Sequence, residues 1–403
     1  MLTSIGSNEG AGTAVAKVAA VSQTSVSQAG GFDFLDLKAQ FATIREEVME
    51  AVTRVMDSQH FILGSEVKLL EEEIAAMLSA KHAVACASGS DALVLAMLAC
   101  EIGADDEVIT TPFTFVATAG SIARVGARPV FVDIEPGTFN INPDGIEAAI
   151  TPKTRAVLPV HLFGLPTDLD PILKIAEARE LVVIEDAAQA IGARYKGSLV
   201  GTLGTFGCFS FFPSKNLGGA GDGGLVTTND SIQAERLRLL RVHGSKTKYH
   251  HEILGMNSRL DALQAAILRV KLGHLESWTR GREANANRYR ALFEETRATR
   301  FVQLPPLPVM ESRHVYNQFC IRCQERDELK EFLRQAGIPT EISYPVPLHL
   351  QKAFSYLGYQ PGEFPQAEKA CQEVLALPVY PELKESQQEA LVRAVANFYS
   401  SMN

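Results

Sequence analysis

The sequence has no long uncharged apolar segment and no excess of positive charge. Its apolar runs stay short of the roughly 20 residues that a membrane-spanning helix needs, so we expect no such helix. Across 403 residues, 38 lysines and arginines stand against 47 acidic residues, which gives a formal net charge of -9. This balance argues against nonspecific binding to nucleic acid or to anionic membranes.

The first 30 residues show neither the pattern of a folded element nor that of a signal peptide. They are rich in serine, glycine and alanine, and Lys17 interrupts their short apolar stretch. This composition predicts a mobile tail and makes a poor signal peptide. We therefore expect a cytoplasmic protein whose folded part begins near residue 31.

Metal-ligand and nucleotide-binding motifs are missing as well. The six cysteines are scattered through apolar runs, and Cys320-x-x-Cys323 has no second pair to complete a zinc site, which predicts buried free thiols. His243, His250 and His251 lie in a polar segment without the spaced acids or cysteines of a metal site. There is no P-loop, and the one G-x-G-x-x-G match precedes a strand pattern, so it is not a dinucleotide fingerprint. We expect no metal.

The chain does contain alternating strand and helix patterns. Seven short β-rich runs between residues 82 and 228 predict strands, several of them buried on both faces, and helical patterns such as residues 91–103 and 169–180 separate many of them. This order predicts an α/β sandwich with a mostly parallel central sheet. From residue 258 a long amphipathic helix leads into a small α+β domain. The predicted division is a disordered tail over 1–30, a large cofactor-binding domain over 31–275 and a small C-terminal domain over 276–403.

Three segments carry residues suited to chemistry. Lys215 precedes a glycine-rich turn in "FFPSKNLGGAGDGG", where it could hold a phosphate, form a Schiff base or face water. Gly89 and Ser90 lie where a strand ends and a helix opens, so they could bind an anion, with a plain serine N-cap as the alternative. Glu185 and Asp186 end another strand, where ligands of α/β sheets bind, although only one of them can face a given cleft. Helix capping is the alternative role for these acids.

Together these features match the needs of one cofactor. Phe113 and Phe115 follow a further strand, and either could stack on a flat ring, with core packing as the alternative. Pyridoxal phosphate requires a lysine for a Schiff base, an acid at the pyridine nitrogen, a phosphate cup and a stacking group. The chain supplies all four, in the order cup, stacking residue, acid and lysine.

Beyond single features, seven segments of the sequence resemble the DegT/DnrJ/EryC1/StrS sugar aminotransferases. The segments are "ASGSDAL", "TPFTFVATA", "VDIEP", "VHLFG", "IEDAAQAIGA", "FSFFPSKNLGGAGDGG" and "GMNSRLDALQAAIL". The resemblance extends from Asp33 to the C-terminus. It implies the aspartate-aminotransferase fold (fold type I), a three-layer sandwich with a small C-terminal α+β domain. It also implies pyridoxal 5'-phosphate as cofactor and a homodimer with shared active sites.

The resemblance assigns roles by position. Lys215 matches the lysine that forms the Schiff base, and Asp186 matches the acid that holds the pyridinium proton, so these are the predicted catalytic residues. Ser90 stands where the family usually has threonine, and the hydroxyl is kept. Asn257 would reach the phosphate of the other subunit. The predicted cofactor-binding residues are Gly89, Ser90, Phe115, Asp186, Gln189, Ser210, Lys215 and Asn257, and the predicted substrate-binding residues are Arg259, Tyr344 and His349.

The implied activity is transfer of an amino group from L-glutamate to a nucleotide-linked keto sugar. Lys215 argues against the sugar dehydratases of this group, which carry histidine at that position. Ser258 is small where enzymes that aminate carbon 4 tend to have an aromatic residue, so we interpret it as leaving room for a sugar pose that presents carbon 3. The alternatives are amination at carbon 4, a keto-inositol acceptor, and a non-enzymatic cofactor-binding regulator on the same fold.

Overall fold

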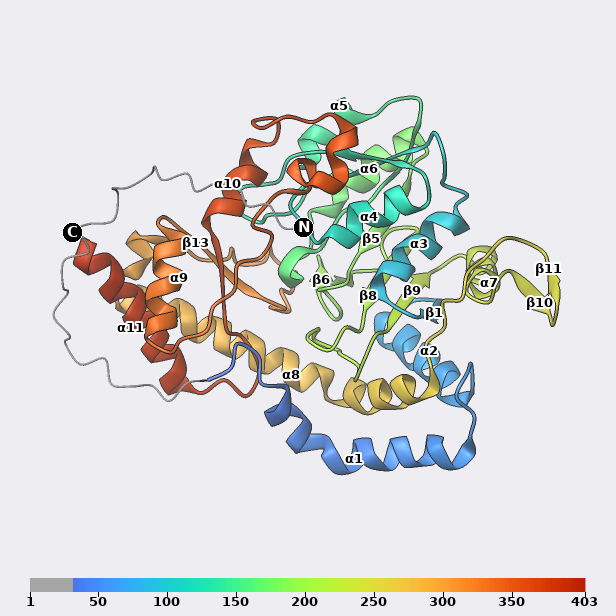
Figure 1. Cartoon of the computed structure of the whole chain (residues 1–403), viewed down its shortest axis with the longest axis horizontal. Helices are drawn as coiled ribbons and strands as arrows, with labels where there is room; N and C mark the ends of the chain where they lie inside the picture. Colours follow the sequence, from blue (N-terminus) through green and yellow to red (C-terminus); the bar gives the residue numbers. More distant parts are fainter. Residues whose placement is uncertain (1–31, 403) are drawn as a thin grey trace, which may run out of the picture.

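A computed structural model describes residues 32–402 of the chain (Figure 1). The predicted tail over residues 1–30 lies outside the described residues. Within residues 32–402, no helix is both long enough and apolar enough to cross a membrane.

A seven-stranded sheet forms the centre of the molecule, with strand order β1-β9-β8-β5-β4-β2-β3. The strands are β1 (His82–Cys86), β2 (Glu107–Thr110), β3 (Arg128–Phe131), β4 (Thr154–Val157), β5 (Val182–Asp186), β8 (Phe206–Ser210) and β9 (Gly224–Thr228). Of these seven, β9 runs against the others, because it pairs antiparallel with both β1 and β8. The remaining pairs are parallel. The predicted mostly parallel sheet is confirmed.

Helices cover both faces of this sheet and give three layers. They are α2 (Ser65–Leu78), α3 (Gly89–Ala99), α4 (Val116–Arg124), α5 (Ile146–Ala149), α6 (Leu169–Arg179), α7 (Ser231–Leu240) and α8 (Ala262–Glu295). The first helix, α1 (Leu37–Ser58), packs against α8 instead. Side chains alternate between the faces along each strand. On β1, Val84 packs with α3 and α7, whereas Ala83 and Ala85 pack with α2 and α8. The predicted three-layer sandwich is therefore confirmed.

A second, smaller core lies at the far end of α8 (Figure 1). Here β12 (Val302–Gln303), β13 (Phe319–Cys323) and β14 (Val374–Leu377) form an antiparallel sheet that packs with α9 (Arg326–Gln335) and α11 (Glu385–Met402). The helix α10 (Pro365–Glu373) leads into β14. Tyr289 and Phe293 of α8 are buried in this core, so the long helix joins the two parts of the molecule. The predicted domain boundary at residue 275 falls within α8.

Two short hairpins lie outside these two sheets. One pairs β6 (Arg194–Tyr195) with β7 (Ser198–Leu199), and the other pairs β10 (Ser245–Thr247) with β11 (His250–His251). The β10–β11 hairpin projects from the body of the molecule (Figure 1). Among the described residues, no three side chains of histidine, cysteine or acid gather as a metal site. All six cysteines are free and five are buried, as predicted.

The strand directions decide where functional side chains meet. Because β1, β2, β5 and β8 run the same way, the residues that follow them lie at one edge of the sheet. The strand β9 begins at that edge, since it runs the opposite way. The turns after β1 and β2, the end of β5 and the whole β8–β9 loop therefore meet at the carboxyl edge, where ligands of open α/β sheets bind.

Candidate active site

A cavity of about 510 Å³ lies at this carboxyl edge of the sheet. Eight of the residues predicted from the sequence line it, namely Gly89, Ser90, Phe115, Asp186, Gln189, Ser210, Lys215 and Tyr344. They come from segments that are far apart in the chain, so the fold brings them together. Three further predicted residues, Asn257, Arg259 and His349, lie outside the cavity lining.

Lys215 lies in the β8–β9 loop, in a turn closed by a hydrogen bond from its N–H to the carbonyl of Phe212 (2.9 Å). The loop packs tightly after the lysine, because a Cβ on Gly218 would lie 2.3 Å from the carbonyl oxygen of Pro213. Burial lowers the pKa of Lys215 from 10.5 to about 8, and the negative charge of Asp186 opposes that shift. Near neutral pH a fraction of the Lys215 amine is therefore unprotonated, and this is the form that attacks a carbonyl carbon.

Asp186 ends β5, and its side chain is 5% exposed. Thr118 Oγ1 donates a hydrogen bond to its Oδ2 over 2.9 Å, and the N–H of Ala188 donates to its Oδ1 over 3.2 Å. Burial raises the pKa of Asp186, while these hydrogen bonds and the charge of Lys215 oppose the rise. An oriented carboxylate beside a cavity is suited to hold a proton on a ring nitrogen. Thr118 was not predicted as a site residue, although it belongs to the "TPFTFVATA" segment.

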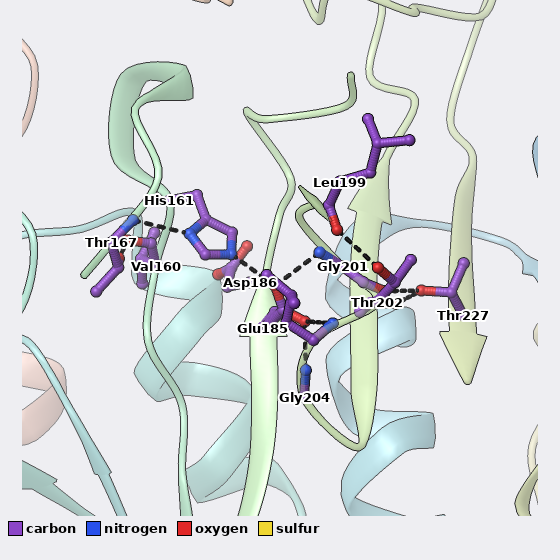
Figure 2. Close-up of polar contacts among 12 residues, drawn as sticks. Val160, His161, Thr167, Glu185, Asp186, Leu199, Gly201, Thr202, Gly204 and Thr227 are labelled. Carbon is purple, nitrogen blue, oxygen red and sulfur yellow. Dashed lines mark hydrogen bonds and ion pairs between the residues drawn. The ribbon is translucent and has the colours of Figure 1, made fainter. Parts of the chain in front are cut away.

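Glu185, the neighbouring acid, faces away from the cavity. It is completely buried, and its carboxylate accepts backbone N–H groups from Gly201 (2.7 Å), Leu203 (2.8 Å) and Gly204 (2.7 Å). Figure 2 shows this cluster beside the end of β5. The alternation of side chains along a strand thus separates two adjacent acids. Glu185 fixes the loop at residues 201–204, and Asp186 is the acid that lines the cavity.

A buried histidine completes the surroundings of Glu185 (Figure 2). His161 Nε2 lies 3.0 Å from Glu185 Oε2, and His161 Nδ1 accepts the N–H of Thr167 over 3.1 Å. A backbone N–H can only donate, so Nδ1 carries no proton. The ring is therefore neutral and donates its Nε2 proton to Glu185. This network gives the end of β5 a rigid support.

The start of α3 is suited to bind an anion. Ser88 is the N-cap, because its Oγ accepts the N–H of Asp91 over 3.1 Å. Ser90 lies within the first turn and lines the cavity. A Cβ on Gly89 would lie 2.6 Å from the Cβ of Ser210, so glycine lets the helix start contact the end of β8. The positive end of the helix dipole and two nearby hydroxyl groups suit a phosphate group.

The two phenylalanines after β2 have different environments. Phe113 is completely buried and packs against Phe139 and Phe163, with ring centroids 5.7 and 6.4 Å apart. Phe115 is 59% exposed and lines the cavity. Phe115 is thus the residue of this pair that can contact a flat ligand.

Gln189 and Tyr344 form one side of the cavity together. Gln189 Oε1 accepts the N–H of Phe163 over 2.6 Å, and its Nε2 donates to the Tyr344 hydroxyl over 3.0 Å. The Tyr344 ring stacks on Phe163, with an interplanar angle of 10°. Burial raises the pKa of Tyr344, so its hydroxyl stays protonated. Both side chains are held in place before any ligand binds.

Ser258 does not line the cavity of its own chain, and its predicted role in leaving room for a sugar stays a prediction. Its side chain is completely buried. Its Oγ donates to Asp91 Oδ2 over 2.7 Å and accepts the N–H of Ala87 over 3.1 Å. Ser258 therefore supports the turn that opens α3. A single sequence could not show this, because Ser258 and Asp91 are 167 positions apart.

His349 likewise lies away from the cavity of its own chain, and its predicted contact with the substrate stays a prediction. The side chain is 2% exposed and lies outside the cavity lining. Its Nε2 is 3.2 Å from Glu368 Oε1, and its ring centroid lies 4.7 Å from that of Phe364. A short helical turn over Leu348–Leu350 places it in the core beside α10.

Asn257 and Arg259 lie in the loop before α8. Asn257 is exposed and pairs by a backbone bridge with Val242, and Arg259 is half-buried. Neither residue lines the cavity of its own chain. Their predicted reach into the site of a second chain stays a prediction.

Comparisons with known proteins give a consistent result. Residues 42–396 match the DegT/DnrJ/EryC1/StrS aminotransferase family. The chain is 54% identical over 365 residues to the pleiotropic regulatory protein of Geobacillus stearothermophilus, which covers 91% of this chain and 98% of that protein. It is 48% identical over 353 residues to the UDP-N-acetyl-3-dehydro-alpha-D-glucosamine 3-aminotransferase of Acidithiobacillus ferrooxidans, covering 88% and 94%.

Solved structures share the fold over most of their length. S. venezuelae DesV in complex with a ketimine intermediate superposes with a TM-score of 0.88 at 42% identity, covering 91% of this chain and 98% of that chain. The NtdA protein of Bacillus subtilis with bound cofactor PMP superposes with a TM-score of 0.85 at 31% identity, covering 93% of this chain and 86% of that chain.

Proposed function

Because this chain belongs to the DegT/DnrJ/EryC1/StrS aminotransferase family, we propose that it transfers the amino group of L-glutamate to carbon 3 of a nucleotide-linked keto sugar. The chain is an aminotransferase, and its cofactor is pyridoxal 5'-phosphate. The observation that carries the proposal is the cavity in which the amine of Lys215 and the carboxylate of Asp186 stand together beside the start of α3.

The residues of this cavity fit the cofactor. The start of α3, with the hydroxyls of Ser90 and Ser210, would hold the phosphate, and the exposed ring of Phe115 would cover one face of the pyridine ring. When bound, the cofactor supplies a conjugated ring that draws electrons from a substrate carbon. Asp186 is already oriented by Thr118, so it would keep the ring nitrogen protonated without rearranging.

Lys215 has two tasks in this reaction. Its partly unprotonated amine would bond covalently to the cofactor in the resting enzyme. When it is not bonded to the cofactor, the amine of Lys215 would act as general base and remove a proton from the carbon that bears the amino group of the donor. Lys215 would return a proton in the second half of the reaction, in which the sugar receives the amino group. A pKa near 8 suits both the removal and the return of a proton.

The choice of carbon 3 is supported by the relatives. The relative from A. ferrooxidans is named a 3-aminotransferase of a 3-dehydro UDP-sugar. Two further relatives are named dTDP-3-amino-3,4,6-trideoxy-alpha-D-glucose transaminase and UDP-2-acetamido-2-deoxy-3-oxo-D-glucuronate aminotransferase. The nucleotide differs among these names, so the proposal covers both UDP and dTDP. Carbon 4 amination and a keto-inositol acceptor are competing outcomes.

A regulatory role without catalysis is the competing function, because one relative is named a regulatory protein. A protein that only binds the cofactor has no need of a lysine with a lowered pKa or of an oriented acid at its ring nitrogen. The joint presence of Lys215, Asp186 and Gln189 in one cavity therefore favours an enzyme. The cytoplasm stays the predicted location.

The acceptor can be tested in a single turnover. We expect purified protein in the amine form of its cofactor to regain the absorbance of the aldehyde form when a UDP- or dTDP-linked 3-keto sugar is added. Parallel samples receive the 4-keto sugars and an inositol ketone. If the absorbance returns only with those ketones, the carbon 3 proposal is wrong and the assignment as an aminotransferase stands. If no ketone restores the absorbance and L-glutamate does not remove it, the regulator is the better account.

The proposed homodimer predicts that two inactive variants rescue each other. Asn257 and Arg259 lie outside the cavity of their own chain, so we propose that they complete the site of the partner. A Lys215→Ala chain mixed with an Asn257→Ala, Arg259→Ala chain should form heterodimers in which one of the two sites is intact. The expected result is partial recovery of activity upon mixing. Heterodimers that form, as shown by mass, but stay inactive would contradict shared sites.

A further inference from the structure

A buried arginine on α8 has hydrogen-bonding groups that the protein does not use. Arg282 is 4% exposed. Its Nη1 donates to the carbonyls of Val379 (2.5 Å), Tyr316 (3.1 Å) and Asn317 (3.4 Å). Every hydrogen bond that the structure gives this side chain comes from Nη1. The N–H groups of Nε and Nη2 are therefore left for another acceptor.

Arg282 also lacks an acidic partner. Within residues 32–402 no carboxylate forms an ion pair with it, and Glu382 influences it only at longer range. Other buried arginines do have carboxylate partners, such as Arg322 with Glu373 and Arg241 with Glu71. A buried charge without a counterion is costly, so a ligand that supplies a negative charge would stabilise it. Burial lowers the pKa of Arg282 to about 10, so the guanidinium stays charged at neutral pH.

This side chain lines a second cavity, of about 220 Å³, next to the first. Ser214 and Gln318 line both cavities, and Ser214 directly precedes Lys215 in the chain. The remaining lining residues are Phe34, Leu35, Asn317 and Val379, none of which is charged. A small anion that enters this space would therefore meet one buried cation and two side-chain amides.

The proposed reaction needs such a group. The amino donor carries a carboxylate, yet among the described residues that line the first cavity Lys215 is the only cation of the same chain, and its amine is reserved for the chemistry. In the proposed homodimer Arg259 of the second chain is the competing cation, and an unchanged glutamate affinity in the Arg282 variant would favour it. We propose that Arg282 binds a carboxylate of the amino donor through its free Nε and Nη2 groups, so that the second cavity is the donor subsite. This inference rests on the proposed aminotransferase function. The planar guanidinium fork matches the two oxygens of a carboxylate.

The inference predicts a defect confined to the donor half of the reaction. Arg282→Met should weaken the apparent affinity for L-glutamate in the half-reaction that forms the amine cofactor by roughly 10- to 100-fold, the typical effect of losing a charged hydrogen bond. The acceptor half-reaction, started from the amine form with a keto sugar, should keep its rate within about threefold. Arg282→Lys keeps the positive charge but lacks the planar guanidinium. Its affinity for L-glutamate should lie between those of wild type and Arg282→Met.

A second readout does not depend on catalysis. Glutarate has both carboxylates of glutamate and no amino group, so it can bind without reacting. It should raise the unfolding temperature of the wild-type holoenzyme and leave that of Arg282→Met unchanged. Arg326→Met is the matched control, because Arg326 is also buried in the small domain and its Nη1 donates to the carbonyls of Cys371 and Val374, but it lines neither cavity. This control should lose stability and still respond to glutarate.

The outcomes separate this inference from the proposed function. If wild type converts L-glutamate and Arg282→Met shows an unchanged glutamate affinity and an unchanged glutarate response, the inference is wrong and the aminotransferase stands. A loss of affinity for an acidic sugar acceptor, with glutamate unaffected, would assign Arg282 to the acceptor and also refute the donor subsite. If wild type converts neither glutamate nor a keto sugar, the proposed function itself fails.

Discussion

Replacing Lys215 with alanine is expected to lower the rate of transamination by about a thousandfold or more. The variant loses both the covalent bond to the cofactor and the general base, and no second amine lines the described cavity to replace them. The cofactor would still bind through the start of α3, because those contacts do not involve the lysine. Initial rates with L-glutamate and a keto sugar measure the loss, and the absorbance spectrum reports the missing covalent bond.

Lys271 provides a matched control for this variant. It is a second buried lysine, its Nζ donates to the carbonyl of Gly218 in the same loop over 2.7 Å, and burial lowers its pKa as well. Lys271→Ala should reduce stability and keep the covalent bond at Lys215. A Lys215→Ala protein that turns over within about tenfold of wild type would show that another group performs the proton transfer.

Asp186→Asn is expected to lower the rate by at least about a hundredfold while the protein stays folded. An amide has no charge with which to hold a proton on the ring nitrogen, so the cofactor draws electrons less strongly. The fold should tolerate the change, because burial raises the pKa of Asp186 and the charged form is therefore the costly one. Removing this charge should therefore not destabilise the fold, since an acid whose pKa rises on folding destabilises the folded state once it is ionised. The unfolding temperature at neutral pH should not fall.

The neighbouring acid, Glu185, provides a control in which we expect stability rather than the chemistry to be affected directly. Glu185→Gln replaces one carboxylate oxygen by an NH₂, which then faces N–H groups that can only donate, either that of Gly201 or those of Leu203 and Gly204. It should cost about 1 to 3 kcal/mol of stability and affect the chemistry only through the loosened end of β5. If Asp186→Asn lost stability and kept its rate, whereas Glu185→Gln kept its stability and lost its rate, the assignment of the two acids would be reversed.

The sequence predicts that the site residues lie close together, because the order and direction of the strands can be inferred from it. Gly89, Phe115, Asp186 and Lys215 each follow or end a strand pattern, and the directions of the strands place all four at one edge of the sheet. The alternation of side chains along a strand predicts that Glu185 and Asp186 face different sides. It does not indicate which of the two lines the cavity, because that depends on the loop and the histidine that pack against Glu185.

The contacts that the sequence did not reveal join segments that are far apart in the chain. Thr118 reaches Asp186 from 68 positions away, and Arg282 becomes notable only when its lack of an acidic partner is seen. Ser258 was singled out because it is small where enzymes that aminate carbon 4 tend to have an aromatic residue, and His349 because its segment resembles the family. Both are buried by residues from other elements, Asp91 in one case and Glu368 in the other. The position of a residue along a strand predicts which face its side chain occupies, but the position of a residue in a turn does not predict where its side chain points.

The measurement that tests the account most directly is the identification of the lysine that carries the cofactor. Borohydride reduces the carbon–nitrogen double bond between a lysine and the cofactor, and peptide mass mapping then locates the label. We predict one labelled lysine per chain, Lys215, with the label lost when L-glutamate is added before reduction. A label on any other lysine, such as Lys271, or an unlabelled protein that still transfers amino groups, would contradict the account.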